Sequence, residues 1–418
     1  MKKQDYSIHI IGAGVSGLIA ARILEDNGFN PVIIEKTERA GGRLKTDMVE
    51  GYQLDRGFQV LLTAYPAAQK YLDLDALKLQ KFTPGAAIFN AGKQSLIGDP
   101  LRDRTLLFST LLSNIGTITD KFKVLKKNKL LKLKTIAEIF EDEENSTMTY
   151  LMDFGFSYLM INQFFKPFFS GIFLEPNLQT SSRMFEFVYK MFGEGYAALP
   201  KSGIEAIPRQ LVQGLKRTTF KYNTSVMSIK EGELLLTNGK SLKSDFTIVA
   251  TDASNLIQNL IRPSTKWKSC DTLYFETKTR VIDKPLIGLI KDSGALINNI
   301  FFHTSLEMAT KPQTELLSVT VVKNHDLSNE ALVSRVQREL RDHCGIQTYK
   351  FLKHYSIPMA LPELKNIKYE VSPSETHLTS GIFLAGDTQL NGSLNAAMIS
   401  GERAALGVLE SINGSKVF

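Results

Sequence analysis

The chain has 418 residues, of which 43% are apolar, 22% charged and 9% aromatic. This composition excludes disordered, collagen-like and coiled-coil proteins, and the length predicts two domains. Two cysteines, Cys270 and Cys344, are too few for a disulfide framework or a zinc cluster and favour a reducing, cytoplasmic compartment. Seven lysines at residues 121–134 account for the whole net charge of +7. The remaining chain is balanced, so we expect no nucleic-acid-binding surface.

The N-terminus has two interpretations. Two lysines followed by an apolar run are typical of a secretory signal. The alternative is a buried strand over residues 6–11, a glycine turn, a helix ending at Gly28 and a second strand over 30–36. We favour this βαβ unit because it explains more of the residues. No run of 18 uncharged apolar residues occurs, so we expect no membrane-spanning helix.

The rest of the chain alternates between helical and strand patterns. Residues 67–200 are mostly helical, with no reliable strand alternation, whereas strands return over 217–250 and 271–323. A helix over 328–345, a strand from 350 ending at Pro358, and a final strand–loop–helix over 381–411 follow. The predicted fold class is α/β: a Rossmann-like domain with a second, α+β substrate domain formed by two insertions. We expect residues 1–66, 201–268 and 366–418 in the first domain, and 67–200 and 269–365 in the second.

Gly12, Gly14 and Gly17 follow the first strand and open a helix. The first glycine permits a tight turn, the second lets the backbone approach a pyrophosphate, and the third permits close helix–strand packing. The phosphates would then bind free N–H groups at the helix N-terminus. Glu35 ends the second strand, 21 residues after Gly14, where its carboxylate can accept from both ribose hydroxyls. These features predict dinucleotide binding.

Further motifs distinguish between dinucleotides. Residues 41–43 (GGR) and 51–58 (GYQLDRGF) follow the acidic residue, and residues 383–401 contain FLAGD, GSLNAA and SG. A nicotinamide domain has no need of the second glycine pair with its arginine. The chain resembles the flavin-containing amine oxidase superfamily, which includes protoporphyrinogen oxidases and phytoene desaturases. The resemblance implies FAD as the cofactor and disfavours an NAD-dependent dehydrogenase.

The resemblance also implies roles for individual residues. Arg43 would contact the diphosphate and flavin, and Asp387 the ribityl and diphosphate region. Residues 393–397 would bring a helix N-terminus to the flavin pyrimidine edge, where it stabilises negative charge on the reduced ring. The backbone of Val226 would contact adenine. The expected cofactor-binding residues are Gly12, Gly14, Ser16, Gly17, Glu35, Lys36, Gly42, Arg43, Gly57, Phe58, Val226, Gly386, Asp387, Ser393, Leu394, Asn395 and Ala397.

The middle of the chain bears on the substrate. Residues 168–173 and 199–208 look like the protoporphyrinogen oxidase and phytoene desaturase members, although Ser202 replaces the first glycine of their P-x-G-G-type turn. The tyrosine–tryptophan pair of many amine oxidases is not evident, and Trp267 lies outside the C-terminal motif. We therefore expect an FAD-dependent oxidoreductase that removes two hydrogens from a small, apolar or amphipathic substrate. The alternatives are an amine oxidase of a polar amine and a non-catalytic FAD-binding redox sensor or scaffold.

Residues 154–196 hold 13 of the 39 aromatic residues, so this segment is the expected source of apolar pocket walls. Packing alone is the simpler explanation for most of them. The pocket candidates are Phe169, Phe173, Phe192, Tyr196, His303 and Tyr355. The sequence names no general base, and the spacing of its six histidines gives no argument for a metal site.

The lysine run at 121–134 also has two interpretations. Peripheral contact with an anionic membrane is one, because each lysine near acidic lipid contributes about 1 kcal/mol. On a helical wheel Phe122, Leu125 and Leu133 share one side, but Lys126 and Lys129 lie close to it, so the helix lacks a clean amphipathic pattern. The acidic run 141–144 would offset some of the charge. A solvated helix of the substrate domain is the favoured interpretation.

Overall fold

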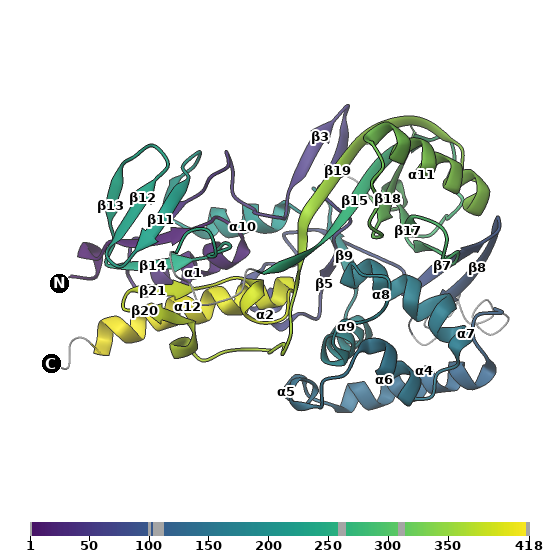
Figure 1. The fold of residues 1–418 in the computed structure, drawn as a ribbon, viewed down its shortest axis with the longest axis horizontal. Helices are drawn as coiled ribbons and strands as arrows, with labels where there is room; N and C mark the ends of the chain where they lie inside the picture. The colour runs from purple at the N-terminus through teal and green to yellow at the C-terminus, as the bar shows by residue number, and fades with distance from the viewer. Residues whose placement is uncertain (1, 99–101, 103–112, 258–264, 308–313, 415–418) are drawn as a thin grey trace.

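Three distant pieces of the chain meet in one six-stranded sheet (Figure 1). The computed structural model describes residues 2–98, 102, 113–257, 265–307 and 314–414. All neighbouring strands are parallel except the edge pair β20–β21, which is antiparallel. This sheet confirms the predicted α/β class. In spatial order its strands are β10 (Thr219–Lys221), β2 (Val32–Ile34), β1 (Ile8–Ile11), β14 (Phe246–Val249), β21 (Ile382–Leu384) and β20 (His377–Thr379).

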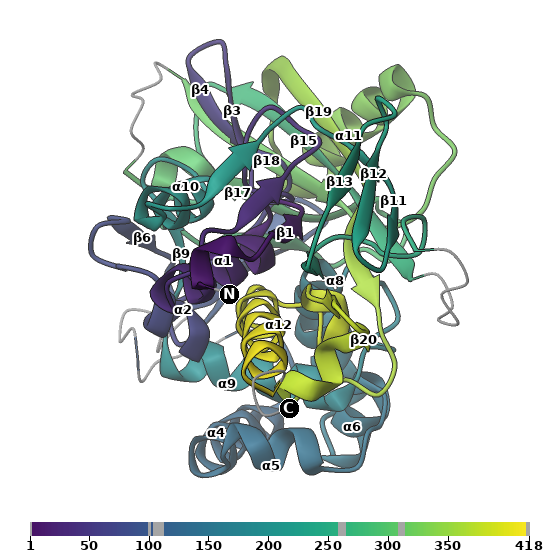
Figure 2. The same ribbon diagram turned by 90° about the vertical axis from the view of Figure 1, so that its left-hand side faces the viewer.

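The two ends of the chain pack together on this sheet. Helix α1 (Val15–Asp26) lies beside α12 (Leu394–Gly414), as Figures 1 and 2 both show. A Cβ atom at Gly401 would lie 2.2 Å from the Ser16 carbonyl oxygen, and one at Gly17 would lie 2.1 Å from that of Gly12. These glycines therefore permit the close approach that brings the N-terminal and C-terminal motifs into one region.

The other face of the sheet carries a small antiparallel sheet. It consists of β11 (Val226–Lys230), β12 (Glu233–Leu236) and β13 (Ser241–Lys243). Ile229 and Leu234 pack there against Ile11 and Val249. Covered on both faces, β1 and β14 are mostly apolar, as parallel strands usually are.

A seven-stranded sheet joins strands from both predicted insertions. Two of its strands, β15 and β19, are long and run toward the first sheet (Figure 1). Helix α11 (Asn329–Cys344) packs on it through Leu332, Val336 and Leu340. The spatial order is β19 (Thr348–Glu363), β15 (Lys266–Thr277), β18 (Glu315–Val321), β17 (Ile297–Phe302), β16 (Ile287–Ile290), β7 (Gly85–Asn90) and β8 (Lys93–Gly98).

Two expectations about strands are wrong. Residues 67–200 contain β6 (Leu79–Lys81), β7, β8 and β9 (Ala197–Pro200). β7 shows no alternation because it lies inside the sheet, with four consecutive buried residues. The strand predicted to end at Pro358 is β19, which continues through this proline to Glu363. An edge strand tolerates this proline because one side of its backbone needs no ladder partner.

The rest of the first insertion is helical, as predicted. Its helices pack around Phe165, Phe169, Phe173, Phe185 and Phe187, which are almost completely buried. A π-helical turn, Ile161–Phe165, separates α7 from α8. The helices are α2 (Pro66–Tyr71), α4 (Ile118–Leu133), α5 (Ile136–Glu141), α6 (Thr147–Asp153), α7 (Tyr158–Met160), α8 (Lys166–Phe173) and α9 (Ser182–Glu194).

Shorter elements connect the two large sheets. β3 (Thr46–Val49) pairs with β4 (Tyr52–Asp55), and β9 lies between β5 (Leu61–Leu62) and β6. Helix α10 (Ala206–Gly214) re-enters beside α1. The predicted boundary between residues 268 and 269 falls within β15, and the domain limits themselves stay a prediction. Among the described helices, none is both long and apolar enough to cross a membrane.

Candidate active site

One large cavity, of about 1620 Å³, collects residues from both ends and the middle of the chain. It exceeds the roughly 300–1,000 Å³ of a pocket for one drug-sized ligand, so it has room for a dinucleotide and a substrate. Fourteen of the expected cofactor residues line it: Gly12, Gly14, Ser16, Glu35, Lys36, Gly42, Arg43, Gly57, Phe58, Gly386, Asp387, Ser393, Leu394 and Ala397. Gly17, Val226 and Asn395 do not.

The glycine turn has the geometry that a dinucleotide needs. Gly12 has a φ of +104°, which favours glycine, and a Cβ there would lie 3.0 Å from the Ala250 carbonyl oxygen. Gly14 lines the cavity, and nothing lies within 4 Å of its Cβ position. The first N–H groups of α1, which begins at Val15, have no acceptor within the helix and suit a phosphate.

Glu35 fastens this turn to the end of β2. Its carboxylate accepts from the Ala13 backbone N–H at 2.8 Å, and from the Thr37 N–H at 2.9 Å and hydroxyl at 2.8 Å. A carboxylate offers about four lone-pair sites, so these bonds leave about one free. In this arrangement Glu35 has room to accept from one ribose hydroxyl, and acceptance from both stays a prediction.

Arg43 and Asp387 join the N-terminal and C-terminal motifs directly. Arg43 Nη2 lies 2.5 Å from Asp387 Oδ1, and its Nη1 donates to the Ala360 carbonyl oxygen at 3.2 Å. The guanidinium carbon lies 5.4 Å from the centre of the Trp267 ring. Trp267 lines the cavity, and its buried indole N–H has no acceptor among the described residues. Arg43 and Trp267 thus place a cation beside an aromatic ring at one wall of the cavity.

The three residues outside the cavity wall have structural positions. Gly17 packs α1 on the turn. Asn395 is buried, and its Oδ1 accepts from the Ala67 N–H at 2.9 Å, which holds α2 against α12. Val226 begins β11, pairs with Leu236 and packs in the cluster behind the six-stranded sheet. The start of α12 is capped by Ser393, whose Oγ accepts from the Ala396 N–H at 3.0 Å.

The turn at residues 200–203 shows which of the two glycines of the P-x-G-G-type turn this fold needs. Gly203 has a φ of +84°, and a Cβ there would lie 2.4 Å from Thr46 Oγ1 and 2.9 Å from Asp55 Oδ1. Ser202 therefore occupies a position that tolerates a side chain, whereas the position of Gly203 does not tolerate one. Asp55 accepts from Thr46 Oγ1 at 2.6 Å and from the Ile204 N–H at 3.0 Å. Burial raises the pKa of Asp55 to about 6.

Aromatic side chains form another part of the wall. The candidates Phe169, Phe173, Phe192 and Tyr196 all line the cavity, and so do Phe164, Phe168 and Tyr189. Phe168 lies 5.5 Å from Phe192 and 5.3 Å from Phe169, between ring centres. This wall is apolar and well packed, as a water-poor pocket requires.

The two polar candidates differ in position. His303 does not line this cavity: it lies behind Phe58, 6.4 Å between ring centres, with its Nε2 2.9 Å from Ser318 Oγ. Burial lowers the pKa of His303 to about 4. Tyr355 lines the cavity, but its hydroxyl donates to Asp47 Oδ2 at 2.9 Å, and burial raises its pKa. Neither group is placed as a free acid or base.

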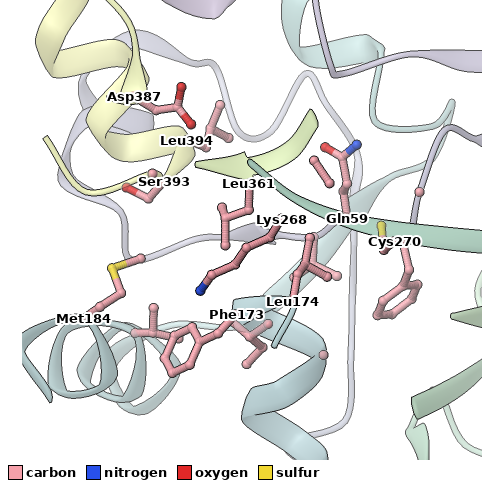
Figure 3. A pocket seen from close by; sticks show the side chains of 18 of the residues that line it. Gln59, Phe173, Leu174, Met184, Lys268, Cys270, Leu361, Asp387, Ser393 and Leu394 are labelled. Atoms are coloured by element: carbon pink, nitrogen blue, oxygen red, sulfur yellow. The ribbon is translucent and has the colours of Figure 1, made fainter. Parts of the chain in front are cut away.

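Several cavity residues were missed by sequence reasoning. Lys268 and Cys270 lie near the start of β15, and both line the cavity (Figure 3). Arg102 donates to the carbonyl oxygens of Phe192 and Gly195 at 2.5 and 2.6 Å. The alternation of a regular strand could not have revealed Lys268 and Cys270, because residues 267–270 all line the cavity and the pairing with β19 shifts register between these two residues. In the described part of the chain, no cluster of three or more His, Cys, Asp or Glu residues could hold a metal ion.

Comparisons with known proteins identify the family of the chain. Residues 15–409 match the model of the flavin containing amine oxidoreductase family. The chain belongs to this family. The match confirms the predicted family, and with it the expected flavin cofactor and oxidoreductase class.

Individual relatives show how far the similarity extends. The chain is 25% identical over 166 residues to protoporphyrinogen oxidase 2 of Arabidopsis thaliana, which covers 39% of this chain and 32% of that protein. It is 40% identical over 57 residues to polyamine oxidase 2 of the same plant, covering 14% and 12%. The chain thus spans about a third or less of the length of these curated relatives.

Solved structures share the whole fold. One is assigned as a protoporphyrinogen oxidase from Exiguobacterium sp.: the TM-score is 0.73 at 18% identity, over 97% of this chain and 99% of that one. Another is putrescine oxidase bound to putrescine, with a TM-score of 0.68 at 15% identity and coverage of 97% and 99%. At these identities the likeness supports the fold class.

The residues of this cavity fit FAD. The open Gly14 position, the start of α1 and Arg43 provide a cradle and donors for a diphosphate. Trp267 and the start of α12 line the same cavity. Cys270 is the cysteine nearest to such a group, but burial raises the pKa of its thiol to about 12 and so makes it a poor nucleophile. We therefore expect the cofactor to bind without a covalent link.

Proposed function

We propose that the protein oxidises a largely apolar substrate by removing two hydrogens, as a desaturase or a protoporphyrinogen oxidase does. The observation that carries the proposal is the aromatic wall of the cavity, which includes Phe168, Phe173 and Phe192. When bound, FAD supplies the chemistry by accepting hydride at its N5 atom. The chain itself would bind the substrate, orient it and exclude water.

The charge of the cavity favours this substrate class over a polar amine. Its lining contains nine lysines and arginines but five aspartates and glutamates. Four of these cations, Lys36, Arg43, Lys45 and Arg56, come from the segment that follows Glu35, and Arg56 is paired with Asp47. The others include Arg102, Lys268 and Lys323, which would repel a cationic amine. An amine oxidase of a polar amine remains the alternative, because the family includes such enzymes.

Anaerobic bleaching of the flavin tests the proposal. The holoprotein is mixed without oxygen with a porphyrinogen, a carotene or putrescine, and the absorbance of the oxidised flavin is followed. We expect bleaching by the porphyrinogen or the carotene and none by putrescine. Bleaching by putrescine alone would establish the amine alternative. FAD that dithionite reduces but no organic substrate bleaches would indicate a redox sensor or scaffold.

We also propose that α4 contacts an anionic membrane peripherally. Its outer side exposes Ile118, Phe122 and Leu133 by 73%, 67% and 75%, which is unusual for large apolar side chains. Lys126, Lys129 and Lys132 are exposed on the same side. Exposed apolar groups flanked by lysines suit the surface of an acidic bilayer.

The cavity reaches the adjacent side of the same helix. Lys121, Val124, Leu125 and Asn128 line it, at the spacing of one helical face. An apolar substrate dissolved in lipid would therefore meet the cavity beside the contact surface. Lys127 takes no part, because it is buried and paired with Glu186. Lys134 pairs with Asp142 and Glu186, so the acidic run does offset part of the charge.

A further inference from the structure

Lys268 is a cation in an otherwise mostly apolar part of the cavity. Figure 3 shows its side chain extending from β15 among Phe173, Leu174, Met184 and Leu361. The side chain is half-buried. Its Nζ donates to Thr180 Oγ1 at 2.9 Å and has no carboxylate within 4.0 Å among the described residues. An ammonium group has three donors, so this leaves two unused.

The neighbouring acids compensate Lys268 only in part. Thr180 Oγ1 accepts from Lys268 Nζ and donates to Glu175 Oε1 at 3.2 Å, and the Glu175 carboxylate also accepts from the N–H groups of Asn177 and Thr180 at 2.8 and 3.0 Å. Glu363 lies at the exposed end of β19. Burial lowers the pKa of Lys268, while both acids raise it, and the effect of burial is the larger. The cation is therefore only partly compensated by the protein.

Other cations of this part of the cavity are used differently. Arg102 and Lys323 donate to backbone carbonyl oxygens, those of Phe192 and Gly195 and those of Ser293 and Ala295. The two free donors of Lys268 instead lie beside apolar side chains, which offer no acceptor. Even a half-buried cation loses part of its hydration, and an anion that accepts from its free donors would offset this cost.

We infer that Lys268 recognises an anionic group, a carboxylate, carried by the otherwise apolar substrate. The inference rests on the proposed function, because it assumes that the substrate occupies this cavity. The substrate class is then an apolar acid: its apolar body contacts the phenylalanine wall, and its carboxylate accepts hydrogen bonds from Nζ. Such charge-assisted bonds are stronger than neutral ones and fix orientation as well as affinity.

Ligand binding to the holoprotein tests this without any turnover. Dodecanoate, dodecan-1-ol and dodecylamine share one apolar chain and differ in the head group. Isothermal titration calorimetry should show dodecanoate binding at least about tenfold more tightly than dodecan-1-ol, and dodecylamine more weakly than both. Lys268→Met should abolish the preference for the acid, and Lys268→Arg should retain it. Lys243→Met, which changes an exposed lysine of β13, should have no effect.

Two outcomes would overturn the inference. One is that the wild type binds dodecanoate no more tightly than dodecan-1-ol, or does not bind dodecanoate. The other is an unchanged preference in Lys268→Met, since a lysine that only supports Thr180 would lower the melting temperature and leave the head-group ratio intact. The proposed function fails separately: a preference for the acid with bleaching only by putrescine would reject the oxidation of an apolar substrate and keep the carboxylate site.

Discussion

Replacement of Glu35 by glutamine tests the dinucleotide site at the residue that organises it. The carboxylate of Glu35 holds the Ala13 and Thr37 N–H groups and has about one acceptor site left for a ribose hydroxyl. An amide has one oxygen, so its NH₂ group must face one of these N–H donors. Loss of a charge-assisted hydrogen bond costs about 1–3 kcal/mol. Glu35→Gln should therefore weaken FAD binding by roughly 5- to 150-fold.

Titration of the apoprotein with FAD, followed by quenching of flavin fluorescence, measures the effect. Glu38→Gln is the matched control, because Glu38 is 70% exposed and pairs with Arg39 near the same turn. Its affinity should stay within about twofold, as for most exposed pairs. Unchanged affinity in Glu35→Gln would refute the reasoning. A lower melting temperature together with unchanged affinity would show that Glu35 supports the turn and does not contact the ribose.

Two further predictions concern stability. Gly17→Ala should destabilise the fold by about 3 kcal/mol, the upper range for overpacking, because its Cβ would lie 2.1 Å from the Gly12 oxygen. At Gly193 nothing lies within 4 Å of the Cβ position, so Gly193→Ala should be neutral or slightly stabilising. Thermal unfolding compares the two variants. Stability should also fall as the pH drops from 6.5 toward 4. Burial lowers the pKa values of His9 and His303 to about 4, so in this pH range these residues take up protons only on unfolding. Asp55 offsets part of this loss, because burial raises its pKa to about 6 and it takes up a proton in the folded state. The free energy of unfolding, measured with urea, should decrease between pH 7 and pH 5 by about 2 kcal/mol less in His303→Gln than in the wild type. An equal decrease in both proteins would contradict the lowered pKa of His303.

The cofactor-binding region could be predicted from the sequence because its geometric requirements are local. Gly12, Gly14 and Glu35 belong to one βαβ unit, so their spacing along the chain determines their spacing in space. The pairing of Arg43 with Asp387 could not be derived this way, since 344 positions separate them and only the crossing of α1 and α12 brings them together. Their motifs indicated a shared ligand, and the contact between them required the fold.

The substrate region was less accessible to prediction for a physical reason. A fully buried strand such as β7 lacks alternation and resembles any other apolar run. Lys268 stood out in no pattern, because its importance comes from Phe173 and Leu361, which other elements supply. His303 looked like a polar pocket residue, yet Phe58 separates it from the cavity. Side-chain direction in this region depends on tertiary packing and has no local signature.

The membrane contact of α4 is tested by co-sedimentation with vesicles. Lys126→Gln, Lys129→Gln and Lys132→Gln are combined, and Lys127 is left unchanged because the loss of its buried partner would destabilise the helix layer. At about 1 kcal/mol for each lysine, the triple variant should bind acidic vesicles roughly 100-fold more weakly. The matched control changes Lys230, Lys240 and Lys243, three exposed lysines around β11–β13, to glutamine.

The contribution of the apolar side chains separates this contact from simple charge attraction. Phe122→Ser with Leu133→Ser keeps every lysine and removes two of the most exposed apolar groups of α4. If these side chains enter the bilayer, the variant should lose the binding to acidic vesicles that persists in the wild type at about 0.5 M salt, where exposed charges are screened within roughly 4–5 Å. Equal recovery of the wild type in the supernatant with neutral and acidic vesicles would reject the contact. Equal loss of binding in the lysine variant and its β11–β13 control would reject α4 as its location.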